Sequence, residues 1–170
     1  MASGKFFPAA GFDLGVASSY ATFNQSTLPR PGMLGQVNED SGNCYRLVQF
    51  DNGSGNIAAA ATHVSYWKTR ASFIVTSDES DGEGLLHGAA GWFLLAVTDQ
   101  NYCFVQIGGS LSVDTDNTAD IGDALILTAT DGRVAGQAAG SVNTVPFGYF
   151  TSDDGSSNVA IAQLYLGMFL

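Results

Sequence analysis

The chain has 170 residues, of which 45% are hydrophobic and 13% are charged, and its formal net charge at pH 7 is −10. A chain of this length suits one domain with a continuous core and leaves no room for a second, enzyme-sized domain. Six lysines and arginines against 16 aspartates and glutamates argue against nucleic acid as a partner, because binding to phosphates requires clustered basic side chains.

The low charged fraction predicts a surface made mostly of small uncharged side chains. Average globular proteins have about 25% charged residues, so this surface is better suited to packing against other protein than to keeping a monomer apart. Residues 71–132 contain no Lys or Arg and are expected to present an acidic face. No apolar run reaches the roughly 18 residues of a membrane span, and no secretory signal is visible, so we expect no membrane partner.

Residues 1–43 are predicted to form an extended N-terminal arm. Pro29 and Pro31 prevent a helix or a central strand around them, because proline fixes φ and lacks a donor. The aromatic residues of the arm are too numerous for a solvated tail and too irregular for a helix, so the arm either lies on a neighbouring molecule or supplies a first strand to its own domain. Its candidate residues for contact with a neighbouring molecule or subunit are Phe6, Phe7, Phe12, Tyr20, Phe23 and Arg30.

Residues 44–170 are predicted to form a single all-β domain, a β-sandwich or β-barrel. Short apolar segments alternate with Gly, Asn and Asp turns, which is typical of such folds. An alanine-rich start at 58–61 could belong to a helix, but the β-branched and aromatic residues that follow favour a strand. The expected strands are 45–50, 57–67, 73–76, 91–98, 102–107, 124–128 and 159–170.

The segment 102–107 carries the clearest strand pattern. Cys103, Val105 and Ile107 alternate with more polar neighbours and are expected to be buried. The pair Gly108-Gly109 is expected to end this strand, after which the next strands follow as a meander. The last apolar run, 159–170, is expected to leave a strand edge that needs a partner subunit.

No metal, cofactor or catalytic site is predicted. Residues 114–120 begin with the oxygen spacing of a calcium-binding EF-hand loop, but Ala119 replaces the required glycine and Leu125 replaces the bidentate glutamate. A solvated loop is the favoured interpretation. The acidic run 78–83 is likewise interpreted as a charged loop tip, and His63 and His87 as structural histidines.

Catalytic motifs are also missing from the sequence. The serines occur in turn sequences without the strand-turn-helix context of a nucleophile elbow, and the carboxylates fall in loops rather than at the ends of strands facing a cleft. Cys44 and Cys103 lack a CxxC or Cys-His spacing and are expected to remain reduced. We therefore expect the protein not to be an enzyme.

The order of four segments resembles the C-terminal half of capsid decoration (cement) proteins of tailed bacteriophages. These segments are YCFVQIGG, ADIGDALILTATDGRVAGQAAG, VPFGYF and VAIAQLYLGMF, and the earlier YRLVQFDNGSGNIAAAA and AAGWFLLAVTDQNYCFVQ resemble the opening strands of that family. The likeness covers residues 44–170. Individually the motifs are short and dominated by glycine, so the resemblance depends on their order and spacing.

The resemblance implies a virion protein, made in the host cytoplasm, that binds the outer capsid surface and stabilises the shell by bridging capsomers. Its expected partners are the major capsid protein and its own copies, with a homotrimer implied by the family. The alternative is a carbohydrate-binding or host-attachment module such as a short head fibre. That alternative requires Trp67, Trp92 and Tyr102 to be exposed on one face.

Overall fold

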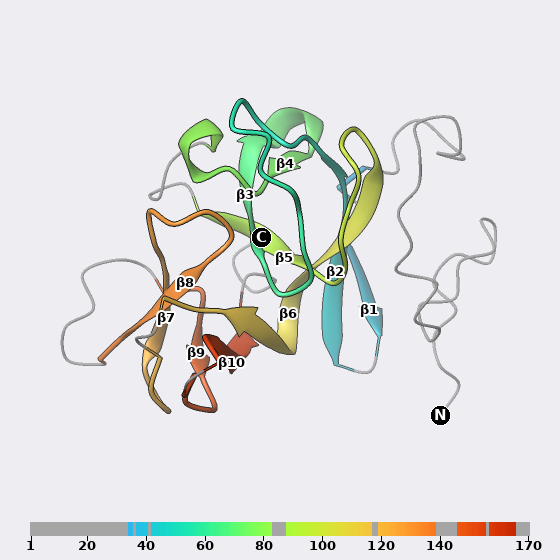
Figure 1. Cartoon of the computed structure of the whole chain (residues 1–170). Coiled ribbons are helices and arrows are strands. Elements are labelled where there is room, and N and C mark those ends of the chain that lie inside the picture. Colours follow the sequence, from blue (N-terminus) through green and yellow to red (C-terminus); the bar gives the residue numbers. More distant parts are fainter. Residues whose placement is uncertain are drawn as a thin grey trace.

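The computed structural model describes residues 34–35, 37–40, 42–82, 88–116, 119–138, 146–155 and 157–165, and this part of the chain is all β, as predicted (Figure 1). Its strands are β1 (Val37–Asp40), β2 (Asn43–Phe50), β3 (Val64–Thr69), β4 (Ile74–Thr76), β5 (Ala89–Phe93), β6 (Tyr102–Asp114), β7 (Ala124–Leu127), β8 (Val134–Gln137), β9 (Gly148–Phe150) and β10 (Val159–Leu164). Two single-turn 3-10 helices, η3 (Arg70–Ser72) and η4 (Glu79–Asp81), flank β4.

Five strands close into a barrel, which we call barrel 1. Its order is β2, β4, β3, β5 and β6, and β6 pairs back onto β2. Closure removes the free strand edges that would otherwise invite pairing with other chains. Inside the barrel, the rings of Phe50 and Phe93 meet edge to face with their centroids 5.4 Å apart. The other buried residues of this core are Val48, Ala59, Trp67, Val75, Ala90, Val97, Cys103, Val105 and Ile107.

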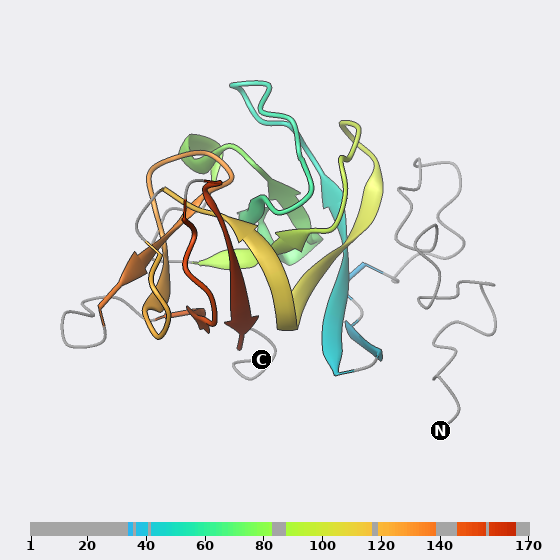
Figure 2. The same cartoon turned by 60° about the horizontal axis from the view of Figure 1, so that its bottom comes forward.

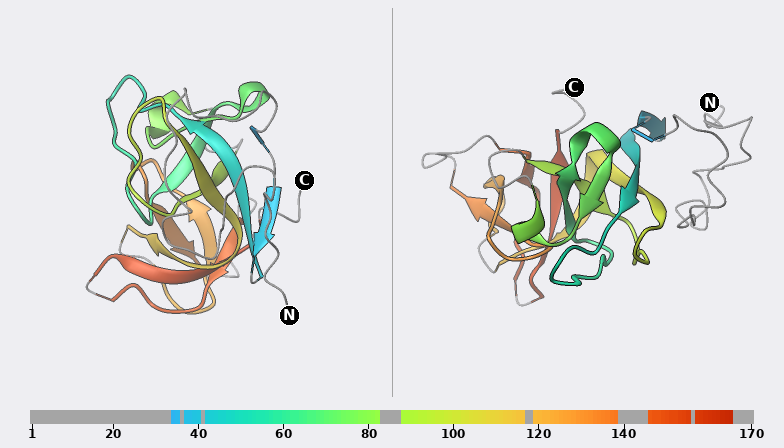
Figure 3. Two further views of the ribbon diagram at one scale, coloured as in Figure 1. Left: turned by 90° about the vertical axis from the view of Figure 1, so that its right-hand side faces the viewer. Right: turned by 90° about the horizontal axis from the view of Figure 1, so that it is seen from above.

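The strands β7 to β10, together with the second half of β6, form a second curled sheet, which we call sheet 2. Its order is β6, β10, β9, β7 and β8. An isolated parallel bridge between Thr115, just after β6, and Val134 at the start of β8 brings the two ends of this sheet together. Its core also receives the outward-facing Val64, Tyr66 and Trp92 from barrel 1. The two groups of strands lie side by side (Figure 3), and these shared core residues form an apolar contact between them.

Strand β6 belongs to both units, because its first half closes barrel 1 and its second half starts sheet 2. Figure 2 shows the strand bending sharply between β2 and β10. The change of partner falls at two glycines: Cys44 of β2 lies opposite Gly108, and Leu164 of β10 lies opposite Gly109. Gly109 has a φ of 91°, a conformation that L side chains rarely adopt.

The prediction that Gly108-Gly109 ends a strand is therefore wrong. The strand continues because its hydrogen-bonding partner changes at this point, and the glycines supply the bend rather than a turn. The prediction that Cys103, Val105 and Ile107 are buried is confirmed, since at most 1% of each is exposed.

Two other predicted strands are too long. The segment 57–67 becomes a strand only at Val64, because Thr62 has a φ of 75° and breaks the extended backbone before it. The segment 91–98 ends as a strand at Phe93, and beyond it Val97 forms only an isolated bridge with Ala59.

The predicted meander is also wrong, although β7 and β8 do form a hairpin. The strand after β6 in sequence, β7, pairs with β9 instead of β6. The strand β10 inserts between β6 and β9 and is paired on both edges. It therefore lacks the open edge from which a partner subunit was inferred.

The predicted arm lies mostly outside the described residues, but its last part is visible. Residues 37–40 form β1, which pairs with the first half of β2. Barrel 1 itself closes with strands that begin at Asn43, so its ring does not include β1.

The two cysteines lie too far apart for a disulfide. Cys44 lies opposite Gly108 and Cys103 opposite Val48, so they are about four residues, or roughly 13 Å, apart along the β2–β6 ladder. Disulfides need Cα atoms within about 7 Å. Burial also raises the pKa of the Cys103 thiol, which keeps it protonated and unreactive.

We predict that Gly109→Ala destabilises the fold far more than Gly122→Ala. Both glycines have positive φ, 91° and 87°, so both substitutions strain the backbone by about 1 kcal/mol. Only at Gly109 would the added Cβ also meet the Asn43 Cα, at 2.9 Å, whereas at Gly122 nothing lies within 4 Å. We expect a further loss of about 2 kcal/mol at Gly109, measured by urea unfolding. Equal losses would show that the bend does not depend on this close approach.

Candidate interaction surface

The carboxylates of barrel 1 bind the backbone of its own loops. Asp78 accepts hydrogen bonds from the Gly55 N–H at 2.8 Å, the Ser80 N–H at 3.0 Å and the Ser80 hydroxyl at 2.6 Å. Asp81 accepts from the N–H and hydroxyl of Ser54, at 2.5 and 2.8 Å. The Ser80 hydroxyl and the Gly55 N–H hold the pKa of Asp78 below its usual range, and the Ser54 hydroxyl and N–H do the same for the pKa of Asp81.

Lys68 joins this network from β3. Its ammonium group lies 2.7 Å from Asp51 and 3.5 Å from Asp81. The hydrogen bond to Asp51 raises the pKa of Lys68, and the same bond lowers the pKa of Asp51. These contacts hold the turn after β2 against the loop that contains η4. Asp78 and Asp81, which belong to the acidic run that was predicted to be a charged loop tip, therefore hold the η4 loop against the turn after β2.

The loop with the partial EF-hand spacing is held in a similar way. Asp114 accepts a hydrogen bond from the Thr62 hydroxyl at 2.5 Å and lies 3.4 Å from the imidazole of His63. Asp116 instead accepts from the Thr130 hydroxyl at 3.0 Å. The two carboxylates therefore serve different loops. Within the described ranges, no three His, Cys, Asp or Glu side chains converge on a possible metal position.

Asp154 organises the far end of the same loop. Its carboxylate, 9% exposed, accepts hydrogen bonds from the Thr115 hydroxyl at 2.7 Å and from the Ala119 N–H at 3.2 Å. It therefore stabilises the segment in which a calcium ligand was considered.

The aromatic platform required by the carbohydrate-binding alternative is not formed by the two tryptophans. Trp92 is fully buried and Trp67 is 4% exposed, and each belongs to an apolar core. Tyr102 is half-buried at the start of β6. Both indole rings are therefore buried and cannot stack against a sugar in solvent.

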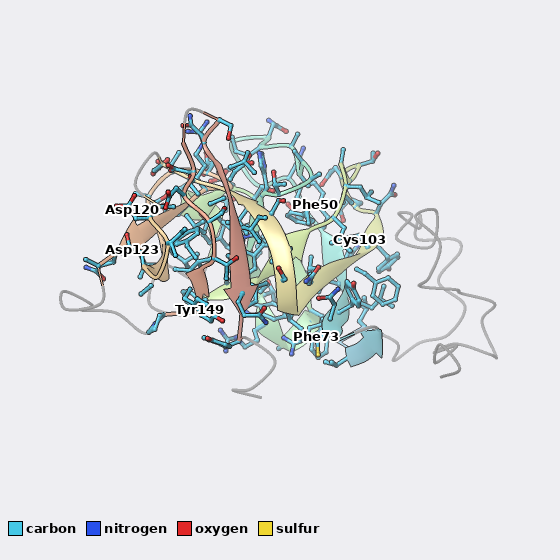
Figure 4. All side chains as sticks on the ribbon, turned by 90° about the horizontal axis from the view of Figure 1, so that it is seen from below. Phe50, Phe73, Cys103, Asp120, Asp123 and Tyr149 are labelled. Atoms are coloured by element: carbon cyan, nitrogen blue, oxygen red, sulfur yellow. The ribbon has the colours of Figure 1, made fainter. Side chains whose placement is uncertain are left out.

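An uncharged apolar strip lies on the outer face of sheet 2. Val159 and Ile161 of β10 are 37% and 45% exposed, and Tyr149 of β9 is 38% exposed. Figure 4 shows Tyr149 on the side of sheet 2, away from Phe50 and Cys103 of barrel 1. We call Tyr149, Val159 and Ile161 the β10 strip.

The neighbours of the strip are mostly uncharged as well. Ser112 lies opposite Ile161 and Ser110 lies opposite Gln163. The ring of Tyr165 packs 5.6 Å from that of Tyr149. Asp114, opposite Val159, is engaged by Thr62 and His63, as described above. In a chain with a net charge of −10, another protein can approach this face without meeting a row of carboxylates.

The pattern of β10 explains why sequence reasoning missed the strip. The small residues Ala160 and Ala162 point into the core, at 1% and 0% exposed, while the larger Val159 and Ile161 point outward. Large apolar residues usually take the inner positions of a strand, so their outward position is an informative exception. A signal was present, because alanine alternates with larger residues from 159 to 163.

The predicted contact residues all fall outside the described residues, and so does His87. These contact residues are Phe6, Phe7, Phe12, Tyr20, Phe23 and Arg30. In the described part of the chain, no helix is long and apolar enough to cross a bilayer.

The described fold defines a class of all-β protein in which one strand joins a closed barrel to a second curled sheet. No family model and no curated protein matches the chain. Among solved structures, it is similar to the N base of the head fibre gp8.5 in bacteriophage phi29, with 12% sequence identity and a TM-score of 0.47. The similarity covers 71% of this chain and 92% of that chain.

We predict that Asp78→Asn destabilises the protein at pH 7 by about 2 kcal/mol, because a charged acceptor of several hydrogen bonds is lost. The folded-state pKa of Asp78 is lowered, so its contribution is complete above the unfolded-state pKa of about 3.9 and is lost as the pH falls through the folded-state value. The difference between variant and wild type should therefore shrink below about pH 4, as measured by thermal melts.

The matched control is Asp120→Asn, which removes the same charge from an exposed loop position. We expect it to change the melting temperature little at either pH. A difference for Asp78→Asn that stays constant from pH 7 to pH 3 would contradict the role given to its carboxylate.

Proposed function

We propose that this protein is a non-enzymatic structural component of a bacteriophage virion, which decorates the outer surface of the capsid. The observation that carries the proposal is the β10 strip, an exposed apolar surface centred on a strand, β10, that is paired on both edges. The order of sequence segments that resembles phage decoration proteins supplies the class of protein to which such a surface would belong.

The use of the carboxylates supports a role without catalysis. Asp78, Asp81 and Asp154 each accept hydrogen bonds from loop groups of the chain itself. A catalytic carboxylate would instead face a cleft where substrate can reach it. The acidic groups described above make the loops more rigid. This rigidity suits a protein that must bind in the same way at many equivalent positions of a capsid lattice.

The proposed partner is the major capsid protein, and the proposed mechanism is multivalent. The β10 strip would form one contact, and the arm of residues 1–43 would form a second with a neighbouring capsomer. Once the first contact is made, the second occurs at a high effective concentration, so weak contacts together resist rupture of the shell. We propose a homotrimer, since closed rings of identical copies match the threefold positions of a capsid.

We predict that Ile161→Glu weakens binding to capsids at least tenfold and leaves the fold intact. The Ile161 side chain is 45% exposed, so a glutamate there costs the fold little but brings an unpaired charge into the contact. Cosedimentation with purified capsids measures the binding, and circular dichroism checks the fold.

The matched control is Ile121→Glu, which makes the same change at an apolar residue that is 67% exposed and lies in the loop before β7. It should bind as the wild type does. Equal capsid binding by the wild type and Ile161→Glu would show that the β10 strip does not contact the capsid.

We further predict that deleting residues 1–33 leaves the β fold intact and lowers capsid affinity. The barrel 1 ring is built from strands that begin at Asn43, and the first described residues hold their place through a Gly35 N–H bond to the Leu47 carbonyl, at 2.7 Å. Loss of the second contact should reduce avidity without changing the core. A truncated protein that is unfolded by circular dichroism would instead assign the arm to the fold, and unchanged affinity would contradict the bridging role.

A further inference from the structure

Two tyrosine rings pack against each other on the outer face of sheet 2. The ring centroids of Tyr149 and Tyr165 lie 5.6 Å apart, and the ring planes are inclined by 38°. Tyr149 belongs to β9, and Tyr165 directly follows β10. Tyr149 lies opposite Gln163 in the β9–β10 ladder, so Tyr165 is its diagonal neighbour on the same face of the sheet. Aromatic side chains are long enough to meet across such a diagonal.

The backbone holds both side chains in this position. β9 and β10 pair from Gly148 to Phe150, and the Tyr165 N–H donates to the Phe147 carbonyl at 2.9 Å. A hydrogen bond also joins the two phenol hydroxyls. The ortho carbons of a phenol flank its hydroxyl group, so this hydrogen bond brings ortho carbons of the two rings toward each other.

An oxidant in solution can reach this pair. Tyr149 is 38% exposed and Tyr165 is half-buried, whereas Tyr45 and Tyr66 are 4% and 2% exposed. Burial and the neighbouring phenol raise the pKa of Tyr165, so this residue is a neutral phenol at neutral pH. A radical formed on one ring therefore has a second phenol beside it, at a far higher effective concentration than any tyrosine of another molecule.

We propose that Tyr149 and Tyr165 form a site of oxidative modification, at which hydrogen peroxide and a haem peroxidase join the two rings into a dityrosine. Each phenol loses one electron and one proton and becomes a phenoxyl radical. The peroxide takes up both electrons and both protons and becomes two molecules of water. The radicals combine through a carbon–carbon bond between ortho carbons, and the hydrogen atom on each bonded carbon then moves to the oxygen, which restores both phenols.

The new bond would fasten the last described strand into sheet 2. β10 lies between β6 and β9, and the bond would link the residue after β10 to β9. A covalent link between residues 149 and 165 restricts the unfolded chain, and so it stabilises the folded one. The inference does not depend on the proposed function, because the reaction needs only this chain and the oxidant.

The test is treatment of the full chain, at micromolar concentration, with hydrogen peroxide and a haem peroxidase. We expect the blue fluorescence of dityrosine and a monomer whose mass is lower by two hydrogen atoms. The yield per molecule should not depend on the protein concentration. The melting temperature should rise by about 5 °C or more. Absence of dityrosine, or its formation only between chains, would overturn the proposal.

Peptide mapping locates the bond. Asp153 and Asp154 lie between the two tyrosines, so an endoproteinase that cleaves before aspartate separates Tyr149 from Tyr165 in the untreated chain. After treatment, the two peptides should remain joined. A dityrosine that joins any other pair of tyrosines would refute the site.

Variants with phenylalanine keep the packed rings and remove the hydroxyl from which the radical forms. Tyr149→Phe and Tyr165→Phe should each lower the dityrosine fluorescence at least about tenfold, with the fold checked by circular dichroism. The matched control is Tyr102→Phe, which changes a half-buried tyrosine at the start of β6 and should react as the wild type does. Wild-type fluorescence from Tyr149→Phe or Tyr165→Phe would show that other tyrosines couple and would contradict the proposal.

Discussion

The fold depends on one strand serving two sheets. The first half of β6 closes barrel 1 against β2, and its second half holds β10, the strand that carries Val159 and Ile161. Backbone conformation makes this possible, because Gly109 takes a positive φ at the place where the partner changes. A side chain at this position would collide with Asn43. The exposed strip of sheet 2 is thus fixed in orientation relative to barrel 1 through continuous backbone pairing.

Acidic side chains have a structural role that the composition does not reveal. With so few cations available, most carboxylates cannot form salt bridges, and those of Asp78, Asp81 and Asp154 instead accept hydrogen bonds from backbone N–H groups and hydroxyls of neighbouring loops. These bonds satisfy donors that irregular loops would otherwise leave unpaired. Among the described basic side chains, Lys68 lies within ion-pair distance of Asp51 and Asp81, and Arg133 lies within ion-pair distance of Asp116.

The sequence predicted the fold class and the strongest strands, because alternation and glycine turns are local signals. The burial of Cys103, Val105 and Ile107 followed from that alternation. Strand order could not be obtained in this way, since the insertion of β10 between β6 and β9 depends on contacts distant in sequence. The β10 strip was missed because its large residues, Val159 and Ile161, face outward.

The position of β10 between β6 and β9 also sets an order of events during synthesis. All strands of barrel 1, apart from the second half of β6, have been made by about residue 108, so that barrel can close while the chain is still being elongated. In sheet 2, β9 and the second half of β6 both pair with β10, which lies at 159–164. Sheet 2 therefore remains incomplete until this strand leaves the ribosome. Folding should proceed in two stages, with the interaction surface formed last.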